Sequence, residues 1–229
     1  MWLSEQADPN WFPPLDQALR EPPGLLAAGG DLKPARLLAA YERGVFPWYS
    51  AQQPILWWSP DPRMVLYPEE FVVSRSLRKT LRNRPFSTRV DSNFAATIRA
   101  CAQPRRSGPD TWLHDEMIES YERLHNLGFA HSVEAYIGER LVGGLYGIQL
   151  GGVFFGESMF SRERDASKVA MARLVEECRA RDIHLIDCQV ASAHLASLGA
   201  REVSRDQFAA LLRRYARRSP SASWGAQAS

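Results

Sequence analysis

The chain has 229 residues, of which 45% are hydrophobic and 24% charged. This balance is typical of a folded globular protein and excludes a wholly disordered chain. The formal net charge of +2 is too small to indicate nucleic-acid binding, so local charge must decide that question. No stretch approaches the roughly 20 apolar residues of a membrane-spanning helix, and the N-terminus has no secretion signal, so we expect no membrane partner.

The cysteines and histidines do not form a recognisable metal or disulfide pattern. The three cysteines, Cys101, Cys178 and Cys188, are odd in number and lack a CxxC pair, and the five histidines are scattered. This spacing argues against a disulfide framework and against zinc. We therefore expect a cytoplasmic protein that uses no metal and no other cofactor.

Residues 1–62 are expected to form a small, loop-rich N-terminal domain. Eleven of the fifteen prolines and ten of the twenty-four aromatic residues lie within residues 1–70. Aromatic residues at this density can bury enough area to fold a segment with little regular structure. One helix is expected, with Asp31 as its N-cap, Pro34 in its first turn and Gly44 at its end.

Residues 63–218 are expected to form a larger α+β domain. Apolar residues from Met117 to Leu124 recur at helical spacing, and Gly128 is expected to end that helix. Further along, the pattern predicts strands at 131–137, 141–149 and 153–160, a helix at 165–181, a strand at 184–190 and a helix at 204–217. This β-β-β-α-β-α order resembles the acyltransferase fold of the GCN5-related family. Residues 219–229 are expected to be a frayed, flexible tail.

The strand at 184–190 carries the first candidate for chemistry. Alternation places Asp187 and Gln189 on one face, and Ile186, Cys188 and Val190 on the other. A carboxylate and an amide on an apolar strand are costly to bury without partners, which points to a site. The alternative is a strand end at which Asp187 caps a loop. Cys188 is expected to be a small core residue and not a nucleophile.

Glu157 is the second candidate. It follows Gly156 within an apolar strand, and that glycine permits close approach of a ligand or of another backbone. We expect an acid inside an apolar pocket. The alternative is a solvated acid on an edge strand.

A basic segment is the third candidate. Residues 74–89 contain no acid and six basic residues, namely Arg75, Arg78, Lys79, Arg82, Arg84 and Arg89. Such local concentration is expected where a protein meets a phosphate backbone. A solvated basic helix face would give the same pattern.

Coenzyme A is disfavoured as an acyl donor by the segment before the helix at 165–181. Members of the acyltransferase fold that use coenzyme A hold its pyrophosphate with a glycine-rich loop at that place. Residues 161–168 read SRERDASK, with two acids and no glycine. The GxSxG, GxxxxGK[ST] and HExxH signatures are also absent from the sequence.

A set of short motifs in fixed order carries a family resemblance over residues 12–215. The motifs are GLLAAGGDL at 24–32, GVFPWYS at 44–50, WWSPDPR at 57–63, GESMFS at 156–161, ASK at 166–168, LIDCQ at 185–189 and LASLG at 195–199. As a set they resemble the bacterial leucyl/phenylalanyl-tRNA–protein transferases. The resemblance implies transfer of Leu or Phe, less readily Met, from aminoacyl-tRNA to acceptor proteins that begin with Arg or Lys. The product would enter the N-degron degradation pathway, and a monomer is expected.

The resemblance also suggests roles for the candidate residues. Asp187 would polarise Gln189 or directly accept the amine proton, Gln189 would orient the amine, and Glu157 would complete a carboxylate pair. The pocket for the transferred side chain would be formed by Phe154, Met159, Ile186, Val190 and Leu145. The tRNA 3′-adenosine would lie against Trp48, Trp112 and Tyr41, and the basic segment would follow the acceptor stem. Two rival functions are an acyl-CoA-dependent N-acetyltransferase and a non-catalytic RNA-binding module.

Overall fold

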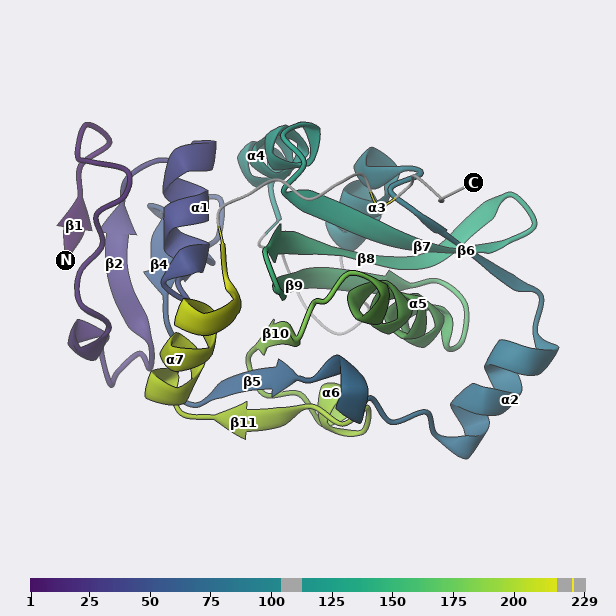
Figure 1. The fold of residues 1–229 in the computed structure, drawn as a ribbon. Helices are drawn as coiled ribbons and strands as arrows, with labels where there is room; N and C mark the ends of the chain where they lie inside the picture. Colours follow the sequence, from purple (N-terminus) through teal and green to yellow (C-terminus); the bar gives the residue numbers. More distant parts are fainter. Residues whose placement is uncertain (104–112, 218–223, 225–229) are drawn as a thin grey trace.

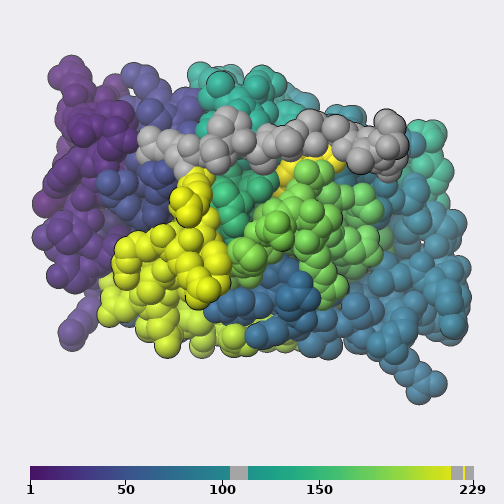
Figure 2. Space-filling model, in the orientation of Figure 1, coloured from purple at the N-terminus to yellow at the C-terminus, as the bar shows by residue number. Residues whose placement is uncertain are grey.

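The computed structural model describes residues 1–103, 113–217 and 224. These residues form two β-sheets with helices packed against them, which confirms the predicted α+β class (Figure 1). The N-terminal residues gather at one end of the molecule, and helix α2 (Arg75–Asn83) lies at the opposite end (Figures 1 and 2). Across these ranges no helix is long and apolar enough to cross a membrane.

The smaller sheet has four strands in the order β1-β2-β4-β3. They are β1 (Trp2–Leu3), β2 (Leu25–Gly29), β4 (Leu56–Trp58) and β3 (Phe46–Pro47), with the 3₁₀ turn η1 at Leu15–Gln17. Helix α1 (Pro34–Glu42) follows β2 and carries Leu37, Leu38 and Tyr41 into the core.

The predicted N-cap of α1 is wrong, although the predicted end is right. Lys33 occupies the N-cap position with Pro34 as the first helical residue, and Asp31 lies two residues further out. There Asp31 accepts a hydrogen bond from the Lys33 backbone N–H and pairs with buried Arg36. Gly44, with φ of +75°, ends the helix in the left-handed conformation that glycine adopts without strain.

The larger sheet has seven strands in the order β11-β5-β10-β9-β8-β7-β6. They are β5 (Arg63–Leu66), β6 (Phe86–Val90), β7 (Ala130–Ile137), β8 (Arg140–Leu150), β9 (Val153–Ser161), β10 (Leu185–Gln189) and β11 (Arg201–Val203). Among the described strands of this sheet only the β9–β10 pair is parallel, and the crossover between these two strands contains α5 (Ala166–Ala180). The predicted order is therefore confirmed from β7 to β10, whereas a short helix at Ala193–Ala196 and strand β11, which were not predicted, precede the expected final helix.

Helices cover both faces of this sheet. Helix α5 lies on one face, and α3 (Phe94–Cys101) and α4 (Asp115–Asn126) lie on the other. The remaining elements are η2 (Pro68–Glu70), α6 (Ala193–Ala196) and α7 (Arg205–Tyr215). Because alternate residues of a strand face opposite sides, Phe154 joins the α5 core and Phe155 joins the core shared with α1 and α4.

The two sheets separate between Trp58 and Arg63, close to the expected boundary at residue 62. One hydrophobic core nevertheless runs from the small sheet to the α4 face of the large sheet. A division into independently folding domains thus stays a prediction. The expectation of a frayed tail is wrong at Trp224, which is buried in the α5 core with 3% of its surface exposed.

Candidate active site

The candidate site lies where strands β9 and β10 stop pairing. Their parallel register runs from Leu185 opposite Val153 to Asp187 opposite Phe155. Just beyond this point each strand contains an extra residue relative to its antiparallel neighbour, Glu157 in β9 and Cys188 in β10. Such bulges bend a strand and change the direction of its side chains, which is how two neighbouring strands come to line one cavity.

The cavity between these strands encloses about 660 Å³. All five residues predicted to hold the transferred side chain line it: Leu145, Phe154, Met159, Ile186 and Val190. Met171 and Leu174 of α5 extend this apolar wall, while Glu157 and Gln189 form a polar region. Val190 is 48% exposed, so it belongs to the rim of the cavity.

Asp187 is held by Arg63 of the neighbouring strand β5. Arg63 Nε donates to Asp187 Oδ1 at 2.8 Å and Nη2 donates to Oδ2 at 2.6 Å, and both side chains are buried. The Arg63 guanidinium also lies 4.6 Å from the Phe46 ring centroid and 4.8 Å from that of Phe208. Both oxygens of Asp187 are therefore committed to a cation, which disfavours the expected role as direct acceptor of the amine proton.

The expected polarisation of the Gln189 side chain by Asp187 also differs from the observed contact. Asp187 Oδ1 accepts a hydrogen bond from the backbone N–H of Gln189 at 2.9 Å. Gln189 has a φ of +62°, an unusual conformation for a residue with a side chain. The Asp187 carboxylate thus stabilises the bulged backbone that directs the Gln189 side chain.

Glu157 is the acid that contacts the Gln189 amide. Gln189 Nε2 donates to Glu157 Oε1 at 2.8 Å, and Tyr121 Oη donates to Glu157 Oε2 at 2.9 Å. The Tyr121 and Tyr41 hydroxyls are 2.7 Å apart. Since the Tyr121 proton is directed at the carboxylate, Tyr41 is the donor in this second contact. The alternative of a solvated acid on an edge strand is wrong, because Glu157 is 9% exposed and lies on an interior strand.

Burial raises the pKa of Glu157 from 4.5 to about 7. Hydrogen bonds from tyrosines and the charge of Arg63 lower this pKa, while the charge of Asp187 raises it. Burial also raises the pKa of Tyr41 and Tyr121 well above 10, so both remain hydrogen-bond donors near neutrality. Glu157 can consequently exchange a proton in the pH range in which an N-terminal amine does so.

Cys188 departs from its expected place in the core. Because it is the extra residue of the β10 bulge, it is half-buried and lines the cavity beside Gln189. Burial raises the pKa of its thiol, with the neighbouring Asp187 charge acting in the same direction. A thiol held in its neutral form is a poor nucleophile, so the expectation that Cys188 is no nucleophile agrees with its surroundings.

The aromatic residues expected to hold a nucleobase differ in their accessibility. Tyr41 has no exposed surface and packs against Phe155, so the expectation that it contacts adenosine directly is wrong. Trp48 is 47% exposed at the cavity, and its carbonyl oxygen accepts a hydrogen bond from Trp58 Nε1. The two indole rings lie 5.7 Å apart. Trp112 lies outside the described residues.

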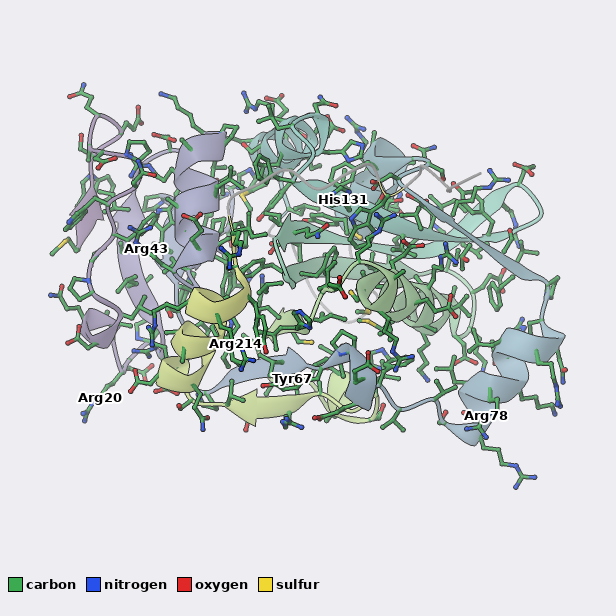
Figure 3. All side chains as sticks on the ribbon, viewed as in Figure 1. Arg20, Arg43, Tyr67, Arg78, His131 and Arg214 are labelled. Carbon is green, nitrogen blue, oxygen red and sulfur yellow. The ribbon has the colours of Figure 1, made fainter. Side chains whose placement is uncertain are left out.

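The basic segment is exposed on and after α2. All six predicted phosphate contacts are at the surface, and Arg78 extends away from the end of the molecule (Figure 3). Four of the six already have partners. Arg89 pairs with Glu139, Arg84 donates to the Arg164 carbonyl oxygen, Arg78 donates to the Val73 carbonyl oxygen, and Arg82 donates to Asn83 Oδ1.

Comparison with known proteins identifies the family. The model of the leucyl/phenylalanyl-tRNA protein transferase family matches residues 65–213, and the model of that family's N-terminal domain matches residues 30–61. Proteins named leucyl/phenylalanyl-tRNA–protein transferase are 56% identical in Aromatoleum aromaticum, over 96% of this chain and 91% of the relative, and 57% identical in Pseudomonas paraeruginosa, over 96% of both. This chain belongs to the leucyl/phenylalanyl-tRNA protein transferase family.

As a member of this transferase family, the chain is an aminoacyltransferase, as its motifs predicted. Similar solved structures include a GCN5-related N-acetyltransferase from Kribbella flavida, which is 12% identical with a TM-score of 0.41 over 75% of this chain and 61% of that chain. In residues 1–103, 113–217 and 224 no group of three His, Cys, Asp or Glu side chains could hold a metal ion.

Two site residues were not predicted from the sequence. Arg63 was part of a family motif without a role, and Tyr121 was counted only as part of an apolar helical stripe. The signal for Arg63 was the buried acid itself, since Asp187 on an apolar strand requires a cationic or hydrogen-bonding partner. For Tyr121, the sequence offered only a hydroxyl on a core-facing helix position, which also needs a partner when buried.

Replacing Arg63 should strongly destabilise the fold. Arg63→Met leaves Asp187 charged and buried without its partner, and we expect the free energy of unfolding to fall by about 3–5 kcal/mol in urea titrations. Arg20→Met removes an exposed arginine at the surface and should change this free energy by less than about 0.5 kcal/mol. Equal, small effects of the two substitutions would contradict the importance assigned to the ion pair.

Proposed function

We propose that this chain transfers leucine or phenylalanine, and less readily methionine, from aminoacyl-tRNA to the N-terminal Arg or Lys of acceptor proteins. Membership of the family supports aminoacyl transfer from tRNA to protein. The single observation that carries the proposal is a cavity whose apolar wall meets the Glu157–Gln189 pair where β9 and β10 diverge. The new N-terminal residue would then mark the acceptor protein for degradation.

The reaction proposed is attack of a neutral amine on an activated ester. The amine nitrogen of the acceptor bonds to the aminoacyl carbonyl carbon, and the ester C–O bond to the 3′-terminal ribose breaks. The amine loses one proton and the departing ribose oxygen gains one. Since the ester is already activated, the protein mainly has to orient the reactants and manage these protons.

The apolar wall suits the side chain of the transferred amino acid. Leu145, Met159 and Ile186, with Met171 and Leu174, offer no polar group that a leucine or phenylalanine side chain would leave unpaired. A volume of about 660 Å³ falls within the range usual for small-molecule sites. The cavity is larger than one leucine or phenylalanine side chain, so it also has space for the ester and the attacking amine. The proposal takes a cytoplasmic monomer as the working unit.

The polar region suits the attacking amine. Gln189 donates Nε2 to Glu157 and so presents its amide oxygen as an acceptor for an amine N–H. Glu157 lines the same cavity, has a pKa near that of the amine, and keeps free lone pairs on its carboxylate oxygens, so it can receive the proton released on attack directly from the amine. As a carboxylate it can also attract a cationic Arg or Lys residue of the acceptor.

Transfer of labelled amino acid tests the proposal directly. Radiolabelled Phe-tRNA or Leu-tRNA, mixed with a protein beginning with Arg, should yield protein-bound label, and the same protein with an acetylated N-terminus should not. Ribonuclease treatment of the donor should abolish transfer. Transfer that survives ribonuclease, or that proceeds from an acyl-CoA, would instead favour an acyl-CoA-dependent enzyme. Equal binding of charged and uncharged tRNA without product would favour an RNA-binding module.

Glu157 should impose a pH dependence on transfer. Below pH of about 7 its carboxyl is protonated and cannot take up the amine proton, so the single-turnover rate at saturating substrate should rise as pH passes through about 7. In Glu157→Gln this inflection should disappear, leaving that of the acceptor amine at roughly 7.7–8.0. At pH 8 the rate should fall by about 10²-fold, a typical contribution of a general base.

Glu119→Gln, which alters an exposed acid on α4, serves as the matched control for this profile. It should keep both the rate and the inflection of the unmodified chain. A Glu157→Gln protein that retains the inflection near pH 7 would remove Glu157 from the proton transfer.

The basic segment should contribute to tRNA affinity without affecting chemistry. Replacing Arg78 and Lys79 together by alanine should raise the KM for charged tRNA several-fold and leave kcat unchanged. It should also reduce the slope of log affinity against log salt by up to about 0.9 for each phosphate that the protein no longer neutralises. Removing Arg20, exposed at the opposite end of the molecule from Arg78 (Figure 3), together with Lys33, exposed at the start of α1, should change neither quantity. Equal effects of the two pairs would contradict a specific interaction of tRNA with α2.

A further inference from the structure

Trp224, near the C-terminus, is buried in a socket on the α5 face of the large sheet. It is 3% exposed, and its Nε1 donates to Gln149 Oε1 at 2.7 Å. Its ring is stacked on that of His131 at a centroid distance of 4.8 Å and an angle of 8°. Arg181, just after α5, donates to the Trp224 carbonyl oxygen at 3.1 Å and places its guanidinium 5.4 Å from the ring. Both ends of the residue are therefore fixed by hydrogen bonds.

This socket is continuous with the candidate aminoacyl pocket through Phe154. The Phe154 ring lies 5.5 Å from the Trp224 ring and also lines the cavity. Gln149 is the cross-strand partner of Phe154, so the hydrogen bond from Trp224 to Gln149 holds the indole over this same pair. The phenyl ring packs against Gly147, where only a glycine leaves room for it, because a Cβ at that position would lie 2.5 Å from Phe154 Cε1.

We propose that Trp224 is a specificity-determining positioning residue, which acts through Phe154 on the apolar end of the cavity. The inference rests on the proposed function, because it concerns the choice among transferred amino acids. The indole forms the support behind Phe154, so the phenyl ring cannot move away from the cavity. This support fixes the depth of the apolar end of the cavity. That depth sets the ratio of kcat/KM for the larger phenylalanine to kcat/KM for the smaller leucine.

The physical reason is the close packing of protein interiors. Removal of a buried indole leaves a void that the surrounding side chains fill only in part. Phe154 borders that void and can turn towards it, which deepens the cavity. A deeper apolar pocket packs more closely around phenylalanine and more loosely around leucine. In hydrophobic pockets, a difference of one methylene already shifts selectivity by roughly 10–200-fold.

The test is the ratio of kcat/KM for Phe-tRNA to kcat/KM for Leu-tRNA, with one acceptor protein beginning with Arg. Trp224→Ala should raise this ratio by roughly tenfold. Trp224→Phe, which keeps an aromatic ring behind Phe154, should give a ratio close to that of the unmodified chain. Gln149→Leu, which removes the acceptor of the indole N–H, should give an intermediate ratio. The KM for the acceptor protein should stay constant in all three variants.

Val175→Ala is the matched control, since Val175 lies in the same α5 core but does not line the cavity. It should lower stability and leave the ratio unchanged. The inference is overturned if Trp224→Ala lowers both kcat/KM values equally, or if Val175→Ala shifts the ratio as much. Should Trp224→Ala not fold, Trp224→Leu keeps an apolar group in the socket and supports the same comparison. Absence of transfer by the unmodified chain would instead remove the proposed function.

Discussion

The buried ion pair between Arg63 and Asp187 is the interaction on which the site depends. Removing two charges from water is costly, and their attraction offsets this cost only with good geometry and full pairing. Here the contact is bidentate and the Arg63 guanidinium lies against the rings of Phe46 and Phe208, while its Nη1 has no hydrogen-bond partner among the described residues. Phe46 belongs to the small sheet, Phe208 to α7, and the ion pair to neighbouring strands of the large sheet. Four separate segments thus converge on one cation.

This pairing separates the two acids of the site into different roles. Asp187 has both oxygens on Arg63 and also fixes the backbone N–H of Gln189, so it stabilises the shape of the β10 bulge. Glu157 has one oxygen on Gln189 and one on Tyr121, and its carboxyl pKa lies near 7. A proton can therefore be exchanged at Glu157 near neutrality without disturbing the ion pair. The bulges in β9 and β10 bring this acid and the amide to the same cavity wall.

Regular elements were predictable wherever local pattern alone determined them. The strands from Ala130 to Ser161 and helix α5 follow from alternation, glycine-bearing turns and helical spacing. Strict alternation failed at 185–190 because an extra residue, Cys188, enters the strand there, and a bulge has no clear sequence signal. The N-cap was misplaced because Asp31, a residue type that favours caps, pairs instead with Arg36. Helices α2 and α3 were not predicted as such.

The candidate site was predictable in its residue types but not in its pairings. Glu157, Gln189 and the apolar wall followed from polar residues on apolar strands together with the family motifs. The partners of the two acids, Arg63 and Tyr121, lie 124 and 36 residues away in the chain, and local spacing cannot connect them. Tyr41 was expected at the nucleobase because it is aromatic, whereas its hydroxyl completes the network behind Glu157. The polar composition of the last residues likewise hid the burial of Trp224.

The proton transfer proposed for this site depends on a Glu157 carboxyl group that titrates near neutrality. The most direct measurement is the pH titration of the Glu157 side-chain carbon by NMR, on protein labelled with ¹³C at glutamate carboxyl carbons. Loss of one signal in Glu157→Gln assigns the resonance. The account predicts a midpoint near pH 7 in the folded protein. A midpoint close to 4.5, the ordinary value for an exposed glutamate, would contradict it.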